Sequence, residues 1–167
     1  PRSPVSPPRL IAVAMMRPGD KLESYRRLAA ALATLTDLDW SLDVIGDGEA
    51  RGEVAAALAP LGLRIRWRGA LDRAAIAAAL GEADLFVWPA INEAFGMALL
   101  EAQASGLPVV AGASGGVSGI VADRETGLLV PPGDPVAFAT ALRFLILDSD
   151  RRAAMGAAAR ARVRREH

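Results

Sequence analysis

The chain has 167 residues, 52% hydrophobic and 23% charged, which indicates a globular domain with a core and excludes a disordered chain. Its 19 basic and 19 acidic side chains give a formal net charge of +0, so no global field favours nucleic acid or an anionic membrane. With no cysteine, and with His167 as the only histidine, disulfides, thiolate metal sites and a histidine-based general base are excluded.

The first half of the chain alternates apolar runs with helical patterns. Proline-rich residues 1–8 are predicted to form a linker, and one domain is expected over residues 9–167. Two runs have the length and composition of buried strands, 10–14 and 84–88, and two further strands are predicted at 40–45 and 63–67. Three helices are predicted between them: 20–36, 49–61 and a helix capped by Asp72 that ends at residue 80. Asp20 and Glu23 have the spacing of a capping box.

The second half continues this alternation. Strands are predicted at 107–111 and 126–130. Helices are predicted from about residue 95 to Gly106, at 117–122 after a glycine-rich loop at 112–116, from Asp134-Pro135, and from residue 150. The pattern predicts an α/β fold, a doubly wound, mostly parallel, Rossmann-like sheet with helices on both faces. Ligands of such sheets bind at the carboxyl ends of the strands.

The predicted helix near residue 95 carries two glutamates in an otherwise apolar or small run. Glu93 lies in the loop before the helix and Glu101 lies almost two turns inside it, which separates the carboxylates by about 12 Å along the axis. Between them, the free first-turn N–H groups of Phe95, Gly96 and Met97 favour an anion, and Gly96 permits close approach of a ligand. A ligand with hydroxyls at both ends and a diphosphate in the middle fits, and a nucleotide sugar is such a ligand.

The two glutamates also have an ordinary structural interpretation. Glu101 is then a solvated position of an amphipathic helix, and Glu93 is a first-turn acid that complements the helix dipole. Gln103 weakens this interpretation, because it lies about 200° around the helix from Glu101 and both cannot share one solvated face. A carboxylate among leucines and alanines needs a partner or a ligand.

Residues 93–102 and 106–110 resemble the E-x7-E signature of the GT-B glycosyltransferases of family 4 (group 1), which act with retention of configuration. The resemblance covers residues 10–160 and is to the C-terminal, donor-binding domain. It implies that Glu93 is catalytic and contacts the donor sugar, and that Glu101 holds the ribose hydroxyls. It also implies that the distal phosphate is held by the backbone of a four-residue run, Ala94, Phe95, Gly96 and Met97.

The loop after the first predicted strand carries Arg17 and Lys21, the only lysine. In the family this loop supplies an arginine and a lysine for the donor phosphates, and cations there offset charge on a departing diphosphate. The match is imperfect, because Ala14-Met15 stands where glycine-arginine is usual, and a salt-paired helix start is the alternative. We expect contacts to the base on the backbone of Gly69, Ala70 and Leu71.

A dinucleotide-like pattern, Gly46-x-Gly48-x-x-x-Gly52, follows the second predicted strand. It is one residue longer than the fingerprint, and its expected acidic partner falls among arginines. We therefore interpret it as a turn, which is similar to the family's loop at this position.

Two other motifs are not expected to supply catalytic or metal-binding side chains. Asp37-Leu38-Asp39 has the spelling of a metal-binding DxD, but it precedes a strand and so lies at the wrong end of the sheet. The loop Gly115-Gly116-Val117 resembles the family's GGxxE block, in which Gly119 replaces the glutamate. We expect this loop to line the donor pocket without that contact.

These residues indicate that the chain is the donor-binding half of a bacterial, cytoplasmic glycosyltransferase of polysaccharide or glycoconjugate synthesis. The expected donor is a UDP- or GDP-sugar, with no metal and no further cofactor, and the expected partner is an N-terminal acceptor domain absent from this chain. The fragment alone is expected to be inactive, with no nucleic-acid partner and with membrane contact only through the missing half. A nucleotide-sugar epimerase of GT-B shape and a non-catalytic nucleotide-binding module remain alternatives, and a dehydrogenase comes last. The base, sugar and acceptor stay open.

Overall fold

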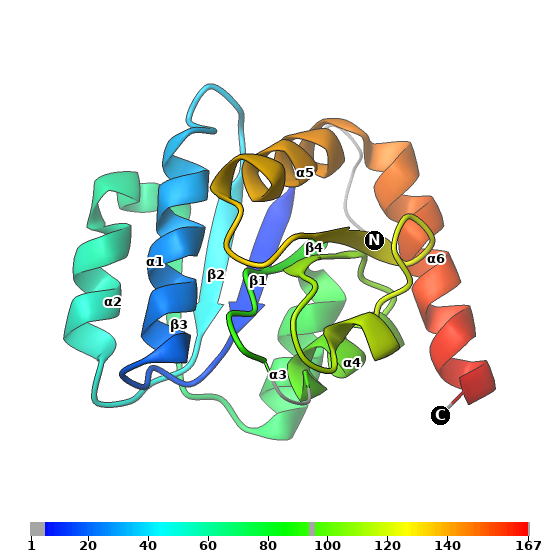
Figure 1. Cartoon of the computed structure of the whole chain (residues 1–167), viewed down its shortest axis with the longest axis horizontal. Helices are drawn as coiled ribbons and strands as arrows, with labels where there is room; N and C mark the ends of the chain where they lie inside the picture. The colour runs from blue at the N-terminus through cyan, green and yellow to red at the C-terminus, as the bar shows by residue number, and fades with distance from the viewer. Residues whose placement is uncertain (1–5, 94–95, 167) are drawn as a thin grey trace.

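A computed structural model describes residues 6–93 and 96–166 and contains a six-stranded sheet (Figure 1). The strand order is β3-β2-β1-β4-β5-β6, and every described pair is parallel. The strands are β1 (Arg9–Val13), β2 (Ser41–Ile45), β3 (Ile65–Gly69), β4 (Leu85–Trp88), β5 (Val109–Gly112) and β6 (Gly127–Val130). All residues of β4 and β5 are buried, which explains why these strands are continuous apolar runs.

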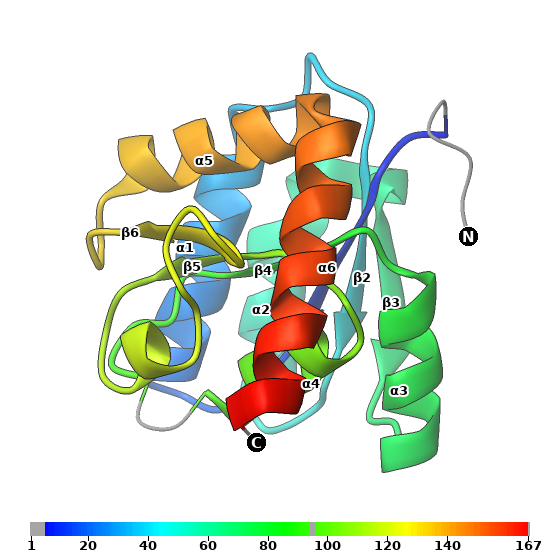
Figure 2. The same cartoon turned by 90° about the vertical axis from the view of Figure 1, so that its right-hand side faces the viewer.

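Helices cover both faces of the sheet, and in Figure 2 they lie in front of it and behind it. One face is covered by α1 (Asp20–Ala33), α2 (Arg51–Leu58) and α5 (Pro135–Leu147), with α1 packed between the other two. The opposite face is covered by α3 (Arg73–Glu82) and α4 (Met97–Ala104), and α6 (Ser149–Glu166) packs on α4. Two short 3-10 helices complete the described chain, η1 (Ala59–Arg64) and η2 (Val117–Gly119). None of the helices in the described ranges is long and apolar enough to cross a membrane.

The predicted doubly wound α/β fold is confirmed, and the strand order explains where a ligand fits. The chain builds β1, β2 and β3 outward in one direction, then returns to place β4 on the other side of β1. Loops leaving β1 and β4 at their carboxyl ends therefore separate toward opposite faces, which opens a crevice between them.

The predicted helix caps were right at two positions and wrong at a third. Asp72 accepts a hydrogen bond from the N–H of Ala75, and Asp134 caps α5 in the same way. Asp20, by contrast, is the first residue of α1 and makes no capping bond, so the predicted capping box is wrong. Gly19 occupies the capping position with a φ of 87°, a left-handed conformation that glycine adopts without strain.

Other differences concern boundaries. Helix α4 begins at Met97, two residues after the predicted start, and the predicted helix at 117–122 is the single 3-10 turn η2. The strand predicted from residue 63 begins at Ile65, because η1 occupies the residues before it.

Candidate functional site

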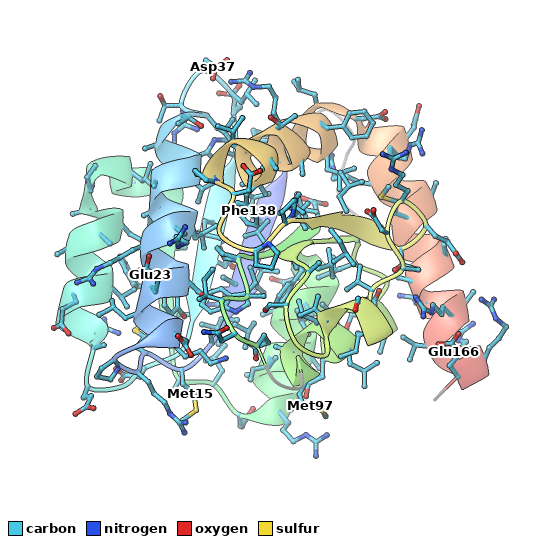
Figure 3. All side chains as sticks on the ribbon, viewed as in Figure 1. Met15, Glu23, Asp37, Met97, Phe138 and Glu166 are labelled. Carbon is cyan, nitrogen blue, oxygen red and sulfur yellow. The ribbon has the colours of Figure 1, made fainter. Side chains whose placement is uncertain are left out.

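A cavity of about 780 Å³ lies at the carboxyl ends of the strands, in the crevice between β1 and β4. Its walls come from the β1–α1 loop, the start of α4, the end of β2 and the turn after β3. Met15 and Met97 line it, are both more than half exposed, and lie at the same edge of the molecule in Figure 3. Asp37 lies at the opposite edge in that view and pairs with Arg143, so the DxD-like triplet is remote from the cavity, as expected.

The structure brings most of the predicted site residues to this one cavity. Of the nine that lie in the described ranges, eight line it: Arg17, Lys21, Ala70, Leu71, Glu93, Gly96, Met97 and Glu101. The ninth, Gly69, ends β3, and its carbonyl accepts a hydrogen bond of 2.9 Å from the N–H of Gly46. Ala94 and Phe95 lie outside the described residues.

Glu93 and Lys21 form an ion pair across the cavity wall. The Nζ of Lys21 donates to both carboxylate oxygens of Glu93, at 2.9 Å to Oε1 and 2.8 Å to Oε2. The side chain of Lys21 is 30% exposed and that of Glu93 is 16% exposed, so the pair is partly shielded from water. The alternative of a salt-paired helix start therefore holds for Lys21, but its partner is the candidate catalytic carboxylate rather than a neighbour on α1.

A buried aromatic pair lies directly behind this ion pair. The indole N–H of Trp88 donates to Oε2 of Glu93 at 3.3 Å, and the Nζ of Lys21 lies 5.9 Å from the ring centroid of Trp88. Tyr25 packs edge-on against Trp88, with centroids 4.8 Å apart and rings at 79°. The hydroxyl of Tyr25 donates to the carbonyl of Ala14 at 2.8 Å, and burial raises the pKa of Tyr25 well above its usual range.

The loop that carries Glu93 has an unusual backbone. Ala90 and Asn92 have φ values of 59° and 52°, a left-handed conformation that is uncommon for residues other than glycine. The hydroxyl of Ser114 accepts from the N–H of Glu93 at 3.1 Å and donates to the carbonyl of Ala90. From the other side, the hydroxyl of Ser24 accepts from the N–H of Ile91 at 3.0 Å. These bonds hold the strained loop in one shape.

The glycine-rich loop after β5 supports the Glu93 loop from behind. In addition to the Ser114 bonds, the N–H of Gly116 donates to the carbonyl of Glu93 at 3.3 Å. None of the described lining residues of the cavity comes from 112–119, so the expectation that this loop lines the pocket is wrong. Its physical role is to hold the backbone of Glu93 while the side chain reaches the cavity.

The first turn of α4 offers free backbone donors. Gly96 is the capping residue, with a φ of 65° and no side-chain capping bond, and its carbonyl accepts the first helical hydrogen bond from Leu100 at 3.1 Å. The N–H groups of Met97, Ala98 and Leu99 consequently have no acceptor within the helix, and all three residues line the cavity. This helix end favours an anion in the cavity, two residues later than the sequence predicted.

Two charged residues of the cavity are free of partners within the described chain. Arg17 is exposed and its guanidinium makes no hydrogen bond or ion pair with any residue in the described ranges. The same is true of the half-buried carboxylate of Glu101. Gln103, in contrast, is 1% exposed and donates to the carbonyl of Ile120 at 2.8 Å. The two polar residues of α4 therefore point apart, as the predicted helical spacing required.

The dinucleotide-like glycines serve backbone packing. A Cβ on Gly46 would lie 1.9 Å from the carbonyl oxygen of Ala14, and one on Gly48 would lie 2.4 Å from that of Met16. The two loops are joined by hydrogen bonds between their backbones, including Met16 N–H to the carbonyl of Asp47 at 3.0 Å. The interpretation of this pattern as a turn is consistent with that geometry. Within the described ranges, no three histidine, cysteine or acidic side chains are placed to hold a metal ion.

Comparison with known proteins agrees with this geometry. The family model described as glycosyl transferases group 1 matches residues 5–162. The chain belongs to this family. The expected GT-B resemblance is therefore confirmed for nearly the whole length of the chain.

Individual group 1 relatives differ in how much they share. A D-inositol 3-phosphate glycosyltransferase of Corynebacterium kroppenstedtii is 50% identical over 74 residues, covering 44% of this chain and 16% of that protein. The D-rhamnosyltransferase WbpZ of Pseudomonas aeruginosa is 36% identical over 144 residues, covering 84% of this chain and 38% of that protein. The chain thus spans less than half the length of these curated relatives.

Solved structures share this fold. Sucrose-phosphate synthase from Thermosynechococcus elongatus matches with a TM-score of 0.83 and 30% identity, over 98% of this chain and 42% of that one. The C-terminal domain of LpcC, a glycosyl transferase group 1 family protein of Francisella tularensis, matches with a TM-score of 0.77 and 26% identity. That match covers 95% of this chain and 85% of the LpcC domain, so the present chain corresponds to one such domain.

Proposed function

We propose that this domain binds the nucleotide-sugar donor of a group 1 glycosyltransferase, which transfers the sugar with retention of configuration. The observation that carries the proposal is the convergence of groups on one cavity. Glu93, Lys21, Arg17, Glu101 and the free amides of α4 come from three segments of the chain and line the same crevice. Together they offer acceptors for hydroxyls at two places and donors for a diphosphate between them.

The donor then extends along the cavity. The base contacts the backbone near Ala70 and Leu71, and Ile76 adds an apolar wall. The ribose hydroxyls donate to the carboxylate of Glu101, which accepts no hydrogen bond from any described residue. The diphosphate lies against the first turn of α4, with Arg17 at the mouth of the cavity. The sugar reaches Glu93.

The cations and amides supply the electrostatic part of catalysis. The bond between the anomeric carbon and the diphosphate breaks, negative charge grows on the departing diphosphate, and the acceptor oxygen bonds to the anomeric carbon from the same face. Lys21, Arg17 and the α4 dipole stabilise the departing charge. The Glu93 carboxylate orients the sugar and stabilises the positive charge that develops on it. The products are the glycosylated acceptor, the nucleoside diphosphate and a proton.

A second domain completes the enzyme in this proposal. The chain spans 16% and 38% of two relatives whose names are glycosyltransferase and rhamnosyltransferase. An acceptor domain that closes over the cavity edge would cover Met15 and Met97, two apolar side chains that are 52% and 60% exposed. The acceptor is then bound by that domain, and this chain supplies the donor.

Uridine and guanosine nucleotides are the first donors to test. HepE of Anabaena, solved in complex with UDP, matches this chain with a TM-score of 0.80 and 25% identity over 94% of it. We would titrate the chain with UDP-glucose, GDP-mannose and ADP-glucose by calorimetry. One of them is expected to bind, and Glu101→Ala is expected to weaken that binding by about tenfold, because hydrogen bonds to the ribose are lost. No binding by any of the three, or binding that Glu101→Ala leaves unchanged, would contradict the donor site.

Catalysis is tested on the whole protein. In the two-domain enzyme, Glu93→Gln is expected to lower kcat by about a hundredfold or more, because the group facing the reacting carbon loses its charge. Product analysis should show a glycosylated acceptor. An epimerised donor sugar would favour the isomerase, and an unchanged kcat in Glu93→Gln would favour a non-catalytic binding module.

A further inference from the structure

Trp88 lies where a buried strand meets the cavity. It is the last residue of β4, it is 3% exposed, and it also lines the cavity. Its indole N–H donates to Oε2 of Glu93 at 3.3 Å. The ring therefore belongs to the core, while its single polar atom contacts the carboxylate that faces the proposed sugar site.

Two donors share the same oxygen of Glu93, and they differ in mobility. Lys21 donates to Oε2 at 2.8 Å from a long side chain that is 30% exposed. Trp88 is fixed by its strand and by the edge-on contact with Tyr25, whose hydroxyl is bonded to the carbonyl of Ala14. A dianionic diphosphate in the cavity competes with Glu93 for the ammonium of Lys21, because one cation cannot fully serve both anions. The indole of Trp88 is neutral, so the diphosphate does not draw it away from Glu93.

We propose that Trp88 is a positioning residue that keeps the Glu93 carboxylate aimed at the donor sugar when the diphosphate draws Lys21 away. This inference rests on the proposed function and extends it. Trp88 acts through Glu93 and touches no reacting atom. Without the indole N–H, the Glu93 side chain would be free to turn toward Lys21, and its hydrogen bonds to the sugar would be lost.

A ratio of two affinities separates this role from simple packing. Trp88→Phe keeps a ring against Tyr25 and Lys21 and removes the N–H donor. For each of UDP-glucose, GDP-mannose and ADP-glucose, calorimetry on the chain compares the nucleotide sugar with its nucleoside diphosphate. A packing defect weakens both ligands, whereas loss of positioning weakens only the ligand that carries the sugar.

We expect the nucleotide sugar to bind more tightly than its nucleoside diphosphate, and Trp88→Phe to reduce this preference by about tenfold, the effect of one hydrogen bond to a charged group. Glu93→Gln should reduce the preference similarly, and adding Trp88→Phe to Glu93→Gln should change it no further. Trp67→Phe is the matched control. Trp67 lies on β3, its ring packs against the guanidinium of Arg51, and it does not line the cavity.

A second measurement uses the unaltered tryptophan. The chain has three tryptophans, so an 15N NMR spectrum resolves three indole N–H groups. We expect Glu93→Gln to shift one signal, distinct from that removed by Trp67→Phe and from that of Trp40, which donates to the carbonyl of Leu35. We also expect this signal to stay protected from exchange with water when the nucleotide sugar saturates the chain.

The outcomes distinguish this inference from the proposed function. If no nucleotide sugar binds, both fail. If a nucleotide sugar binds with a preference that Trp88→Phe leaves intact, the donor site stands and the positioning role is overturned. Equal affinity for the nucleotide sugar and the diphosphate in the unaltered chain, or loss of protection of the indole N–H on donor binding, overturns the positioning role as well.

Discussion

At the scale of single residues, the ion pair between Lys21 and Glu93 makes function and stability interdependent. Each charge is the other's principal partner, and both side chains are shielded enough that an unpaired charge would be costly. The proposed reaction uses them separately, Lys21 on the phosphate and Glu93 on the sugar. Without a ligand, the two groups that the proposed reaction uses therefore neutralise each other's charge.

This mutual dependence predicts a non-additive pattern of unfolding free energies. Lys21→Met should lower the free energy of unfolding by about 1–2 kcal/mol, because the Glu93 carboxylate loses its cation in a partly buried place. Adding Glu93→Gln to Lys21→Met should restore most of that loss. Urea denaturation of the chain and its three variants measures the cycle. Additive losses in the double variant would mean that the two side chains do not interact in solution.

The candidate site was predictable by residue type but not by partner. Glu93, Glu101 and Arg17 were expected in the cavity from their spacing and from the family signature, and the structure places them there. The contacts of Trp88 and Ser114 with Glu93 were missed, because Ser114 lies 21 positions away and nothing local reveals the pairing. A tryptophan ending a buried strand was the available signal, since its N–H needs an acceptor.

At the scale of elements, the loops after β1 and β2 lie backbone against backbone. Gly46 and Gly48 make this possible, because a side chain at either position would overlap a carbonyl of the β1–α1 loop. That loop also carries Arg17 and leads to Lys21. The geometry of the second loop therefore determines where the proposed phosphate-binding groups begin.

Alanine substitution is predicted to have opposite effects at two nearby glycines, one in the loop after β2 and one in α2. Gly46→Ala should lower the free energy of unfolding by about 2–4 kcal/mol, because the methyl group meets the Ala14 carbonyl and the φ of 145° is unfavourable. Gly52→Ala, within α2 and with open space around it, should raise it by about 0.5–1 kcal/mol. Thermal unfolding compares the two variants. Equal effects would contradict the packing role of Gly46.

Element type was predictable here, and element boundaries were less so. Each of the six described strands was expected close to its place, and β4 and β5 are continuous apolar runs because parallel strands buried on both faces are apolar on both. The start of α4 was placed two residues early and the capping box was wrong, because Gly19 and Gly96 both adopt left-handed conformations before a helix. A glycine in a sequence shows that such a conformation is permitted, but not that it is used.

At the scale of the whole molecule, the cavity is a joint product of both halves of the sheet. Its lining comes from the ends of β1, β2 and β4 and from the turn after β3, so a nucleotide bound as proposed would contact segments from residue 13 to residue 101. Binding should therefore stabilise the domain as one cooperative unit.

This joint construction gives a quantitative expectation. At a nucleotide concentration 100 times its Kd, the free energy of unfolding should rise by about 2.7 kcal/mol, with one unfolding transition throughout. Differential scanning calorimetry of the chain with the nucleoside diphosphate identified by titration checks this. A second transition that the nucleotide leaves unmoved would show that part of the sheet unfolds independently of the site.

The pairing of β1 with β4 has a further consequence, for the path by which the chain folds. Lys21 and Glu93 are 72 positions apart, and they meet only because these two strands lie side by side. Contacts between distant segments form slowly, because a long stretch of chain must close before they contribute any stability. The site therefore cannot exist in an early intermediate that holds only local helices. A nucleotide that binds as proposed would therefore bind the folded domain and no partly folded form that lacks this strand pair.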